Sequence, residues 1–136
     1  DDFAMLKVAE WFQEREAITP RTIIQTLRMG FFKLFNVMMS MRTGLDVSLI
    51  DLMVSEDGGR SVSVLCKAIE VDKPSFVSIF LLSRGARPGE QIVNPKELST
   101  AIAAFDKINV GMAKGLIDTW KKDPSYLLSR MKQAIH

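Results

Sequence analysis

The stretch FFKLFNVMMSMRTG, residues 31–44, decides the fold class of this chain. Its polar interior residues recur three, four and three positions apart, which draws one narrow polar stripe along an α-helix: Lys33, Asn36, Ser40 and Thr43. The apolar residues between them form a wider band than the roughly 100° stripe of an ordinary surface helix. Either neighbouring helices cover Phe32 and Met39, or that face meets a partner or an upstream repeat. We expect the first.

Apolar spacing and cap residues predict further helices on both sides of this stretch. Their expected ranges are 3–16, 19–29, 46–55, 61–71, 73–84, 94–108, 109–122 and 123–135. The range 61–71 opens as Ser-Val-Ser-Val, which alternates like a strand, but its neighbours favour a helix. Asn94 with Glu97 resembles a capping box. The fold class is therefore all-α, either a HEAT-like helical repeat or an irregular bundle of about eight to nine short helices.

Three predicted helices end alike, with arginine in the last turn and glycine at the end. These ends are Leu27–Gly30, Met41–Gly44 and Leu82–Gly85. Arginine there complements the helix dipole, and glycine suits the left-handed cap. Residues 32–44 and 76–85 are also candidates for equivalent helices of a repeat with a period near 40 residues.

Composition and charge bound the class of protein. The chain has 136 residues, of which 47% are hydrophobic and 25% are charged, and its net charge is +2. These values fit a single α-helical domain over residues 1–136, with 1–18 as a candidate end of a preceding unit. The chain begins with Asp1, so we expect it to be a fragment of a longer protein. A single cysteine and no long apolar run favour the cytoplasm.

Residues that support catalysis or metal binding are scarce. His136 is the only histidine and the last residue, and Cys66 lies among apolar neighbours without a histidine partner. No nucleotide-binding, hydrolase or zinc motif is present. Isolated carboxylates such as Asp106 and Asp118 are the sole basis for an enzyme hypothesis. We therefore expect no enzyme activity, no catalytic residues, no cofactor and no metal.

Two stretches are candidates for binding another protein. In the loop after residue 83, arginines lie beside glycines that permit close approach, and the candidate residues are Arg84, Arg87, Glu90 and Gln91. The weaker candidate is the methionine group Met38, Met39 and Met41, because methionine suits adaptable surfaces. An ordinary solvated loop and an ordinary core helix are the respective alternatives.

The second half of the chain is mildly basic, with 11 basic and 7 acidic residues over 61–136. Lys121, Lys122, Arg130 and Lys132, near Trp120 and Tyr126, could form a basic patch with aromatic side chains. Basic residues near a C-terminus need no nucleic acid to explain them. Nucleic-acid binding is thus the alternative function.

Several segments resemble a known family. LLSRGARPGEQIVNPKEL at residues 81–98, AFDKI at 104–108 and WKKDPSYL at 120–127 are similar to uncharacterised alphaproteobacterial helical proteins with HEAT-like repeats. The earlier segment at residues 27–59 is similar to the repeated helix and glycine pattern of that family. The resemblance implies a helical-repeat fold and a bacterial cytoplasmic protein, and it carries no catalytic residue across.

These observations favour a non-catalytic helical module for protein–protein interaction, either adaptor or regulatory. Self-association is one version of that function. We expect no membrane partner and identify no small-molecule substrate. The partner itself is not specified by the sequence.

Overall fold

The computed structural model describes residues 2–56, 58–85 and 94–135. These residues form helices and no strand, which confirms the all-α class. The helices are α1 (Asp2–Glu14), α2 (Pro20–Arg28), α3 (Phe32–Thr43), α4 (Val47–Val54), α5 (Arg60–Ala68), α6 (Lys73–Arg84), α7 (Pro95–Lys107), α8 (Val110–Lys122) and α9 (Pro124–Ala134). No helix among the described residues is long and apolar enough to cross a membrane.

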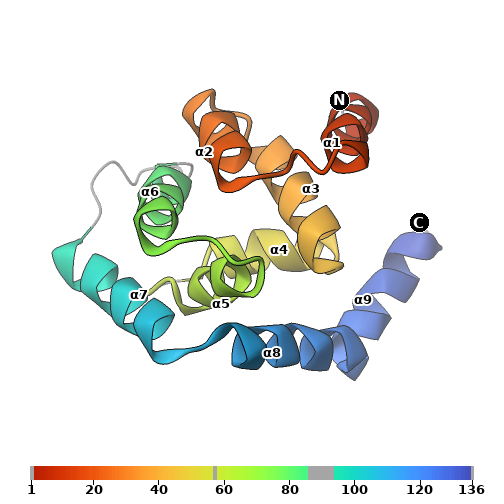
Figure 1. The fold of residues 1–136 in the computed structure, drawn as a ribbon. Helices are drawn as coiled ribbons and strands as arrows, with labels where there is room; N and C mark the ends of the chain where they lie inside the picture. The colour runs from red at the N-terminus through yellow and green to blue at the C-terminus, as the bar shows by residue number, and fades with distance from the viewer. Residues whose placement is uncertain (1, 57, 86–93, 136) are drawn as a thin grey trace.

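Helix α5 lies at the centre of the arrangement (Figure 1). It contacts α3, α4, α6, α7 and α8, and its range confirms the predicted helix over 61–71, although it ends at Ala68. A helix in this position must bury most of its surface, and Val62, Leu65 and Cys66 are fully buried. The hydroxyl of Ser63, also buried, donates to the carbonyls of Gly59 and Ala101.

The predicted helix at residues 31–44 is α3, and other helices cover it on several sides. It contacts α1, α2, α4 and α5. Met38 and Met39 are buried, while Phe32 and Met41 are half-buried. The expectation that neighbouring helices cover this helix is confirmed.

The polar stripe of α3 largely packs inside the protein. Asn36 and Thr43 are buried, and the Asn36 amide donates to Asp51 of α4 at 3.1 Å. Thr43 accepts from the backbone N–H of Leu45 at 3.2 Å. Lys33 is exposed. The stripe therefore joins α3 to α4 and to the turn between them.

At two helix ends the arginines have partners that the sequence did not predict, and at one of them the cap also differs from the prediction. The last-turn arginines Arg42 and Arg84 bind carbonyls of other segments: Arg42 donates to Ile18 at 2.7 Å and to Ile69, the C-cap of α5, at 3.3 Å. Gly85 has φ −64°, so the expected left-handed cap at this position is wrong. Gly30 and Gly44 do adopt it, both with φ 79°. The arginines thus connect helices as well as lying at helix ends.

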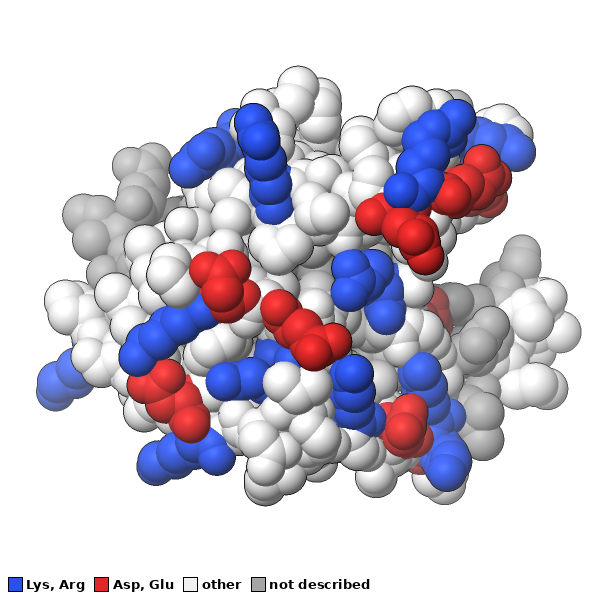
Figure 2. Space-filling view, in the orientation of Figure 1, with Lys and Arg blue, Asp and Glu red and all other residues white. Residues whose placement is uncertain are grey.

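Helix α9 projects from the end of α8 (Figure 1). Its first turn is attached to the rest of the protein by Tyr126, which is buried and whose hydroxyl donates to the carbonyl of Gly44 at 3.2 Å. Beyond that turn the described side chains of α9 are exposed. This geometry leaves a hollow between α9 and α1, visible at the right of Figure 2.

Candidate functional site

The structure places the described members of the predicted binding residues in the core or in a buried polar network. Met38 and Met39 belong to the core, and Met41 packs against it. Arg84 is only 3% exposed. Arg87, Glu90 and Gln91 lie outside the described residues. Among the described residues, no surface assembled from these side chains is present.

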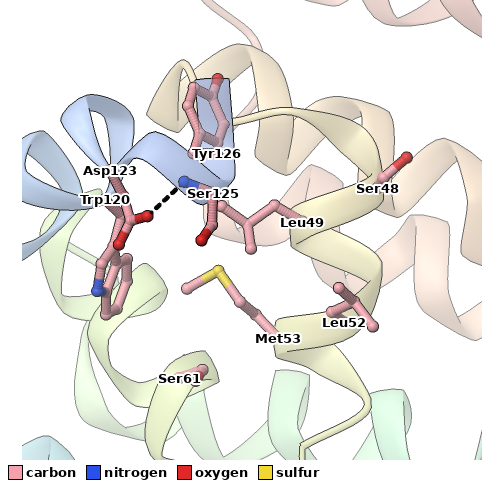
Figure 3. Close-up of a pocket in the computed structure, with 9 residues that line it drawn as sticks. All are labelled: Ser48, Leu49, Leu52, Met53, Ser61, Trp120, Asp123, Ser125 and Tyr126. Atoms are coloured by element: carbon pink, nitrogen blue, oxygen red, sulfur yellow. Dashed lines mark hydrogen bonds between the residues drawn. The ribbon is translucent and has the colours of Figure 1, made fainter. Parts of the chain in front are cut away.

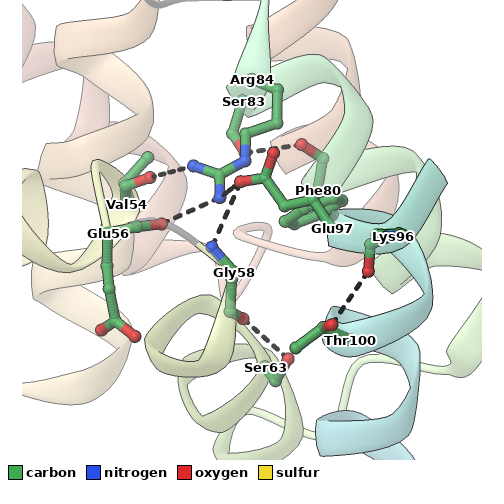
Figure 4. Close-up of polar contacts among 11 residues, drawn as sticks. Val54, Glu56, Gly58, Ser63, Phe80, Ser83, Arg84, Lys96, Glu97 and Thr100 are labelled. Carbon is green, nitrogen blue, oxygen red and sulfur yellow. Dashed lines mark hydrogen bonds and ion pairs between the residues drawn. The ribbon is translucent and has the colours of Figure 1, made fainter. Parts of the chain in front are cut away.

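Arg84 instead links α6 to α4 and α7 (Figure 4). Its guanidinium forms an ion pair with Glu97 and donates to the carbonyl of Glu56 at 2.9 Å and to that of Val54 at 3.5 Å. It also lies 4.8 Å from the centre of the Phe80 ring. The N–H groups of the Arg84 guanidinium therefore donate to carbonyls at the C-terminal end of α4.

Glu97 has a different role from the one that the sequence predicted. Asn94 does cap α7, since its side chain accepts from the N–H of Lys96 at 2.9 Å. Glu97, however, accepts from Arg84 and from the backbone N–H of Gly58 at 3.2 Å. The capping-box interpretation of Glu97 is therefore wrong, because a buried arginine from α6 is the partner that its carboxylate meets.

Cys66 lies in the core, whereas the carboxylates Asp106 and Asp118 lie at the surface. Cys66 is fully buried, and burial raises the pKa of its thiol to about 12, so the thiol is protonated at neutral pH. Asp106 pairs with Lys73 at 2.9 Å on the surface, and Asp118 is exposed on α8. Within the described part of the chain, no group of three or more His, Cys, Asp or Glu could hold a metal ion.

An open pocket of about 400 Å³ lies where α4 faces the α8–α9 junction (Figure 3). Its apolar lining comes from Leu49, Leu52, Met53, Trp120 and Tyr126, and we call it the apolar pocket. Leu52 is 69% exposed. An exposed leucine beside two aromatic rings and a methionine is the composition of a binding surface for an apolar side chain.

The rim of the apolar pocket is polar. It includes Ser48, Ser61, Asp123 and Ser125. Asp123 accepts from the backbone N–H of Ser125 at 2.7 Å, which fixes the turn that places Tyr126 against the pocket. An apolar centre inside a polar rim is typical of protein-binding sites.

A second hollow of about 530 Å³ lies between α1, α3 and α4. Its charged lining consists of Asp2, Asp46, Asp51 and Lys33, three carboxylates against one ammonium, and we call it the acidic hollow. Ser48 lines both the acidic hollow and the apolar pocket. The two therefore adjoin along the exposed side of α4, and we call them together the groove.

Asp46 is a charged residue of the groove with one buried oxygen that has no hydrogen-bond partner among the described residues. It occupies the N-cap position of α4, yet its side chain makes no cap hydrogen bond. One of its carboxylate oxygens, Oδ2, is buried and has no hydrogen-bond partner among the described residues. Because no donor binds this oxygen, the charge of the Asp46 carboxylate adds to that of the acidic hollow, which favours a cationic ligand over an anionic one.

Sequence reasoning missed the groove. It assigned Trp120 and Tyr126 to a basic patch, whereas both rings line the apolar pocket. Lysine and arginine side chains on the face in Figure 2 are interspersed with aspartate and glutamate. One feature of the sequence could have indicated the groove. The α4 sequence, VSLIDLMV, is apolar at six of its eight positions, which is more than a helix with one buried face needs.

The fold and this groove define an irregular all-α bundle with an open, partly apolar surface channel. The chain belongs to the family DUF2336, described as an uncharacterised protein conserved in bacteria, which matches residues 3–118. No curated protein and no solved structure matches the chain. The family match includes the α4 floor of the groove and ends before Trp120 and Tyr126.

Proposed function

We propose that this chain is a non-catalytic protein-interaction module that binds a partner helix in the groove along α4. The observation that supports the proposal is that Leu52 is 69% exposed. Leu52 lines the apolar pocket with Trp120 and Tyr126, and that pocket adjoins the acidic hollow. An amphipathic helix recognises such a site by placing apolar anchors in the groove and polar side chains along its rim.

The proposal is tested by affinity capture from bacterial cells that naturally contain the protein, using the full chain as bait. Leu52→Glu places a charge in the apolar pocket and should abolish capture of the partner. Met29→Glu is the matched control, because Met29 is also exposed, at 58%, and is outside the groove. Equal loss in both variants, or loss in neither, would exclude the groove as the binding site.

We also propose that the bundle contains a HEAT-like repeat and acts in the cytoplasm. Arg42 and Arg84 support the repeat: they are 42 positions apart, each lies in the last turn of its helix, and each donates to two carbonyls of other segments. The two helices that carry them are those proposed as repeat mates, α3 and α6. An experimental structure in which these helices superpose together with their neighbours would support this proposal.

Nucleic-acid binding stays the alternative prediction. Its support is the basic second half of the chain, including the exposed Lys122 and Lys132. Phosphate contacts by such residues would give an affinity that falls steeply with salt. We expect no salt-dependent binding of DNA or RNA in a fluorescence anisotropy titration at low ionic strength, because Trp120 and Tyr126 line the apolar pocket. Salt-dependent binding would favour the alternative.

A further inference from the structure

Helix α9 exposes an apolar stripe. Leu128 is 55% exposed and Met131 is 65% exposed, and Ile135, one residue past the helix, is 80% exposed. Spacings of three and four place these side chains on one side of the helix. Of the other helices, α9 packs mainly on α8, and the ribbon of α9 extends away from the end of α8 (Figure 1).

The charge of this segment is opposite to that of the acidic hollow. Residues 124–136 include Arg130 and Lys132 and no acidic residue. The acidic hollow has three carboxylates against Lys33, and Asp46 contributes the oxygen that lacks a donor. Apolar and basic side chains of α9 thus match the apolar and acidic parts of the groove.

The spacing also matches. Leu128 and Lys132 are four residues apart, roughly 6 Å along one face of α9. On α4, Ser48 and Leu52 are separated by the same four residues, and Ser48 is the residue at which the acidic hollow adjoins the apolar pocket. A helix lying along α4 can therefore place an apolar side chain in the pocket and a lysine near the carboxylates.

We propose that the occupant of the groove is helix α9 of a second copy of this chain. This inference rests on the function proposed above and names its partner. The α9 helix of the same copy does not fill the groove, because Tyr126 fixes its first turn at Gly44 and its apolar stripe is exposed. In a two-fold dimer each copy inserts α9 into the groove of the other, so one pair of complementary surfaces is used twice.

The oligomeric state of the full chain tests this proposal. Sedimentation velocity over a range of concentrations should show a reversible dimer for the unmodified protein. Met131→Glu on α9 and Leu52→Glu in the groove should each raise the dissociation constant by at least about tenfold. Met29→Glu should leave it unchanged. Because all three positions are exposed, circular dichroism melting should show that the variants remain folded.

Charge exchange adds a test of how the two copies are matched. Asp2→Lys and Lys132→Glu should each weaken the dimer, and the double variant should recover most of the loss, since the opposite charges face each other again. A dimer that Met131→Glu leaves intact would overturn the proposal, and so would a chain that stays monomeric at every concentration. If the dimer proposal fails but capture of another protein still depends on Leu52, the proposed binding function of the groove stands with a different occupant. If that capture does not depend on Leu52, both the dimer and the proposed binding function are wrong.

Discussion

Arg84 shows how far a single residue depends on distant parts of the chain. Its guanidinium is buried between carbonyls of the α4 end and the carboxylate of Glu97 from α7. The sequence indicates only an arginine before a glycine, which is equally consistent with a solvated loop. No local pattern shows which acceptors a side chain will meet when they are 13 to 30 positions away.

Arg84→Met should lower the free energy of unfolding by about 3–5 kcal/mol, because it removes the buried guanidinium that pairs with Glu97 and donates to two carbonyls. Arg28→Met is the control, since Arg28 is an exposed last-turn arginine of α2. Urea denaturation of both variants measures the difference. Similar small losses in the two would contradict the structural role of Arg84.

A side chain at Gly59 should destabilise the protein more than one at Gly30. Its φ is +68°, and an added Cβ would lie 2.3 Å from Cε1 of Phe80, a fully buried ring. Gly30 has φ +79° and open space around it. In both variants the alanine must adopt a left-handed backbone conformation, which costs about 1–2 kcal/mol. In Gly59→Ala the new Cβ also clashes with Phe80. We expect Gly59→Ala to lose about 1–3 kcal/mol more than Gly30→Ala in urea denaturation, and equal losses would show that Phe80 can move aside.

At the scale of elements, hydrophobic spacing and caps predicted the helices in their correct order. Asn94 and Asn109 accept the expected N-terminal hydrogen bonds. The helices are 8–13 residues long, shorter than the predicted 10–15, mainly because α2, α4 and α5 are only 8 or 9 residues long. Tertiary packing determines where a short helix ends, since so few turns supply little stability of their own.

The N-caps of α2 and α4 should differ in their contribution to stability. Thr19 accepts from the N–H of Thr22 at 3.3 Å, so Thr19→Ala should cost about 1 kcal/mol. Asp46 makes no cap bond and has an unpaired buried oxygen, so Asp46→Ala should cost only a few tenths of a kcal/mol or stabilise the protein. Urea denaturation compares them. A loss of 1 kcal/mol or more at Asp46, about that of an ordinary cap, would assign it a role in stability rather than in binding.

At the scale of the whole molecule, the fold class was predictable and the groove was not. The groove joins α4 with the α8–α9 junction, more than 60 positions later in the sequence, and an apolar residue in a helical pattern looks the same whether it is core or surface. Leu52 and Leu65 illustrate this: both lie in short apolar helices, yet the first is 69% exposed and the second is fully buried.

Site-specific photo-crosslinking tests the central claim that the groove binds a protein. A photoreactive phenylalanine analogue at position 52 reports contacts in the groove, and the same analogue at the exposed position 29 is the control. In native cells, we expect a discrete protein adduct from position 52 and none from position 29. If the adduct joins two copies of this chain, mass spectrometry should locate the crosslink in residues 124–136 of the second copy. No adduct from position 52, or the same adducts from both positions, would contradict the assignment of the groove as the binding site.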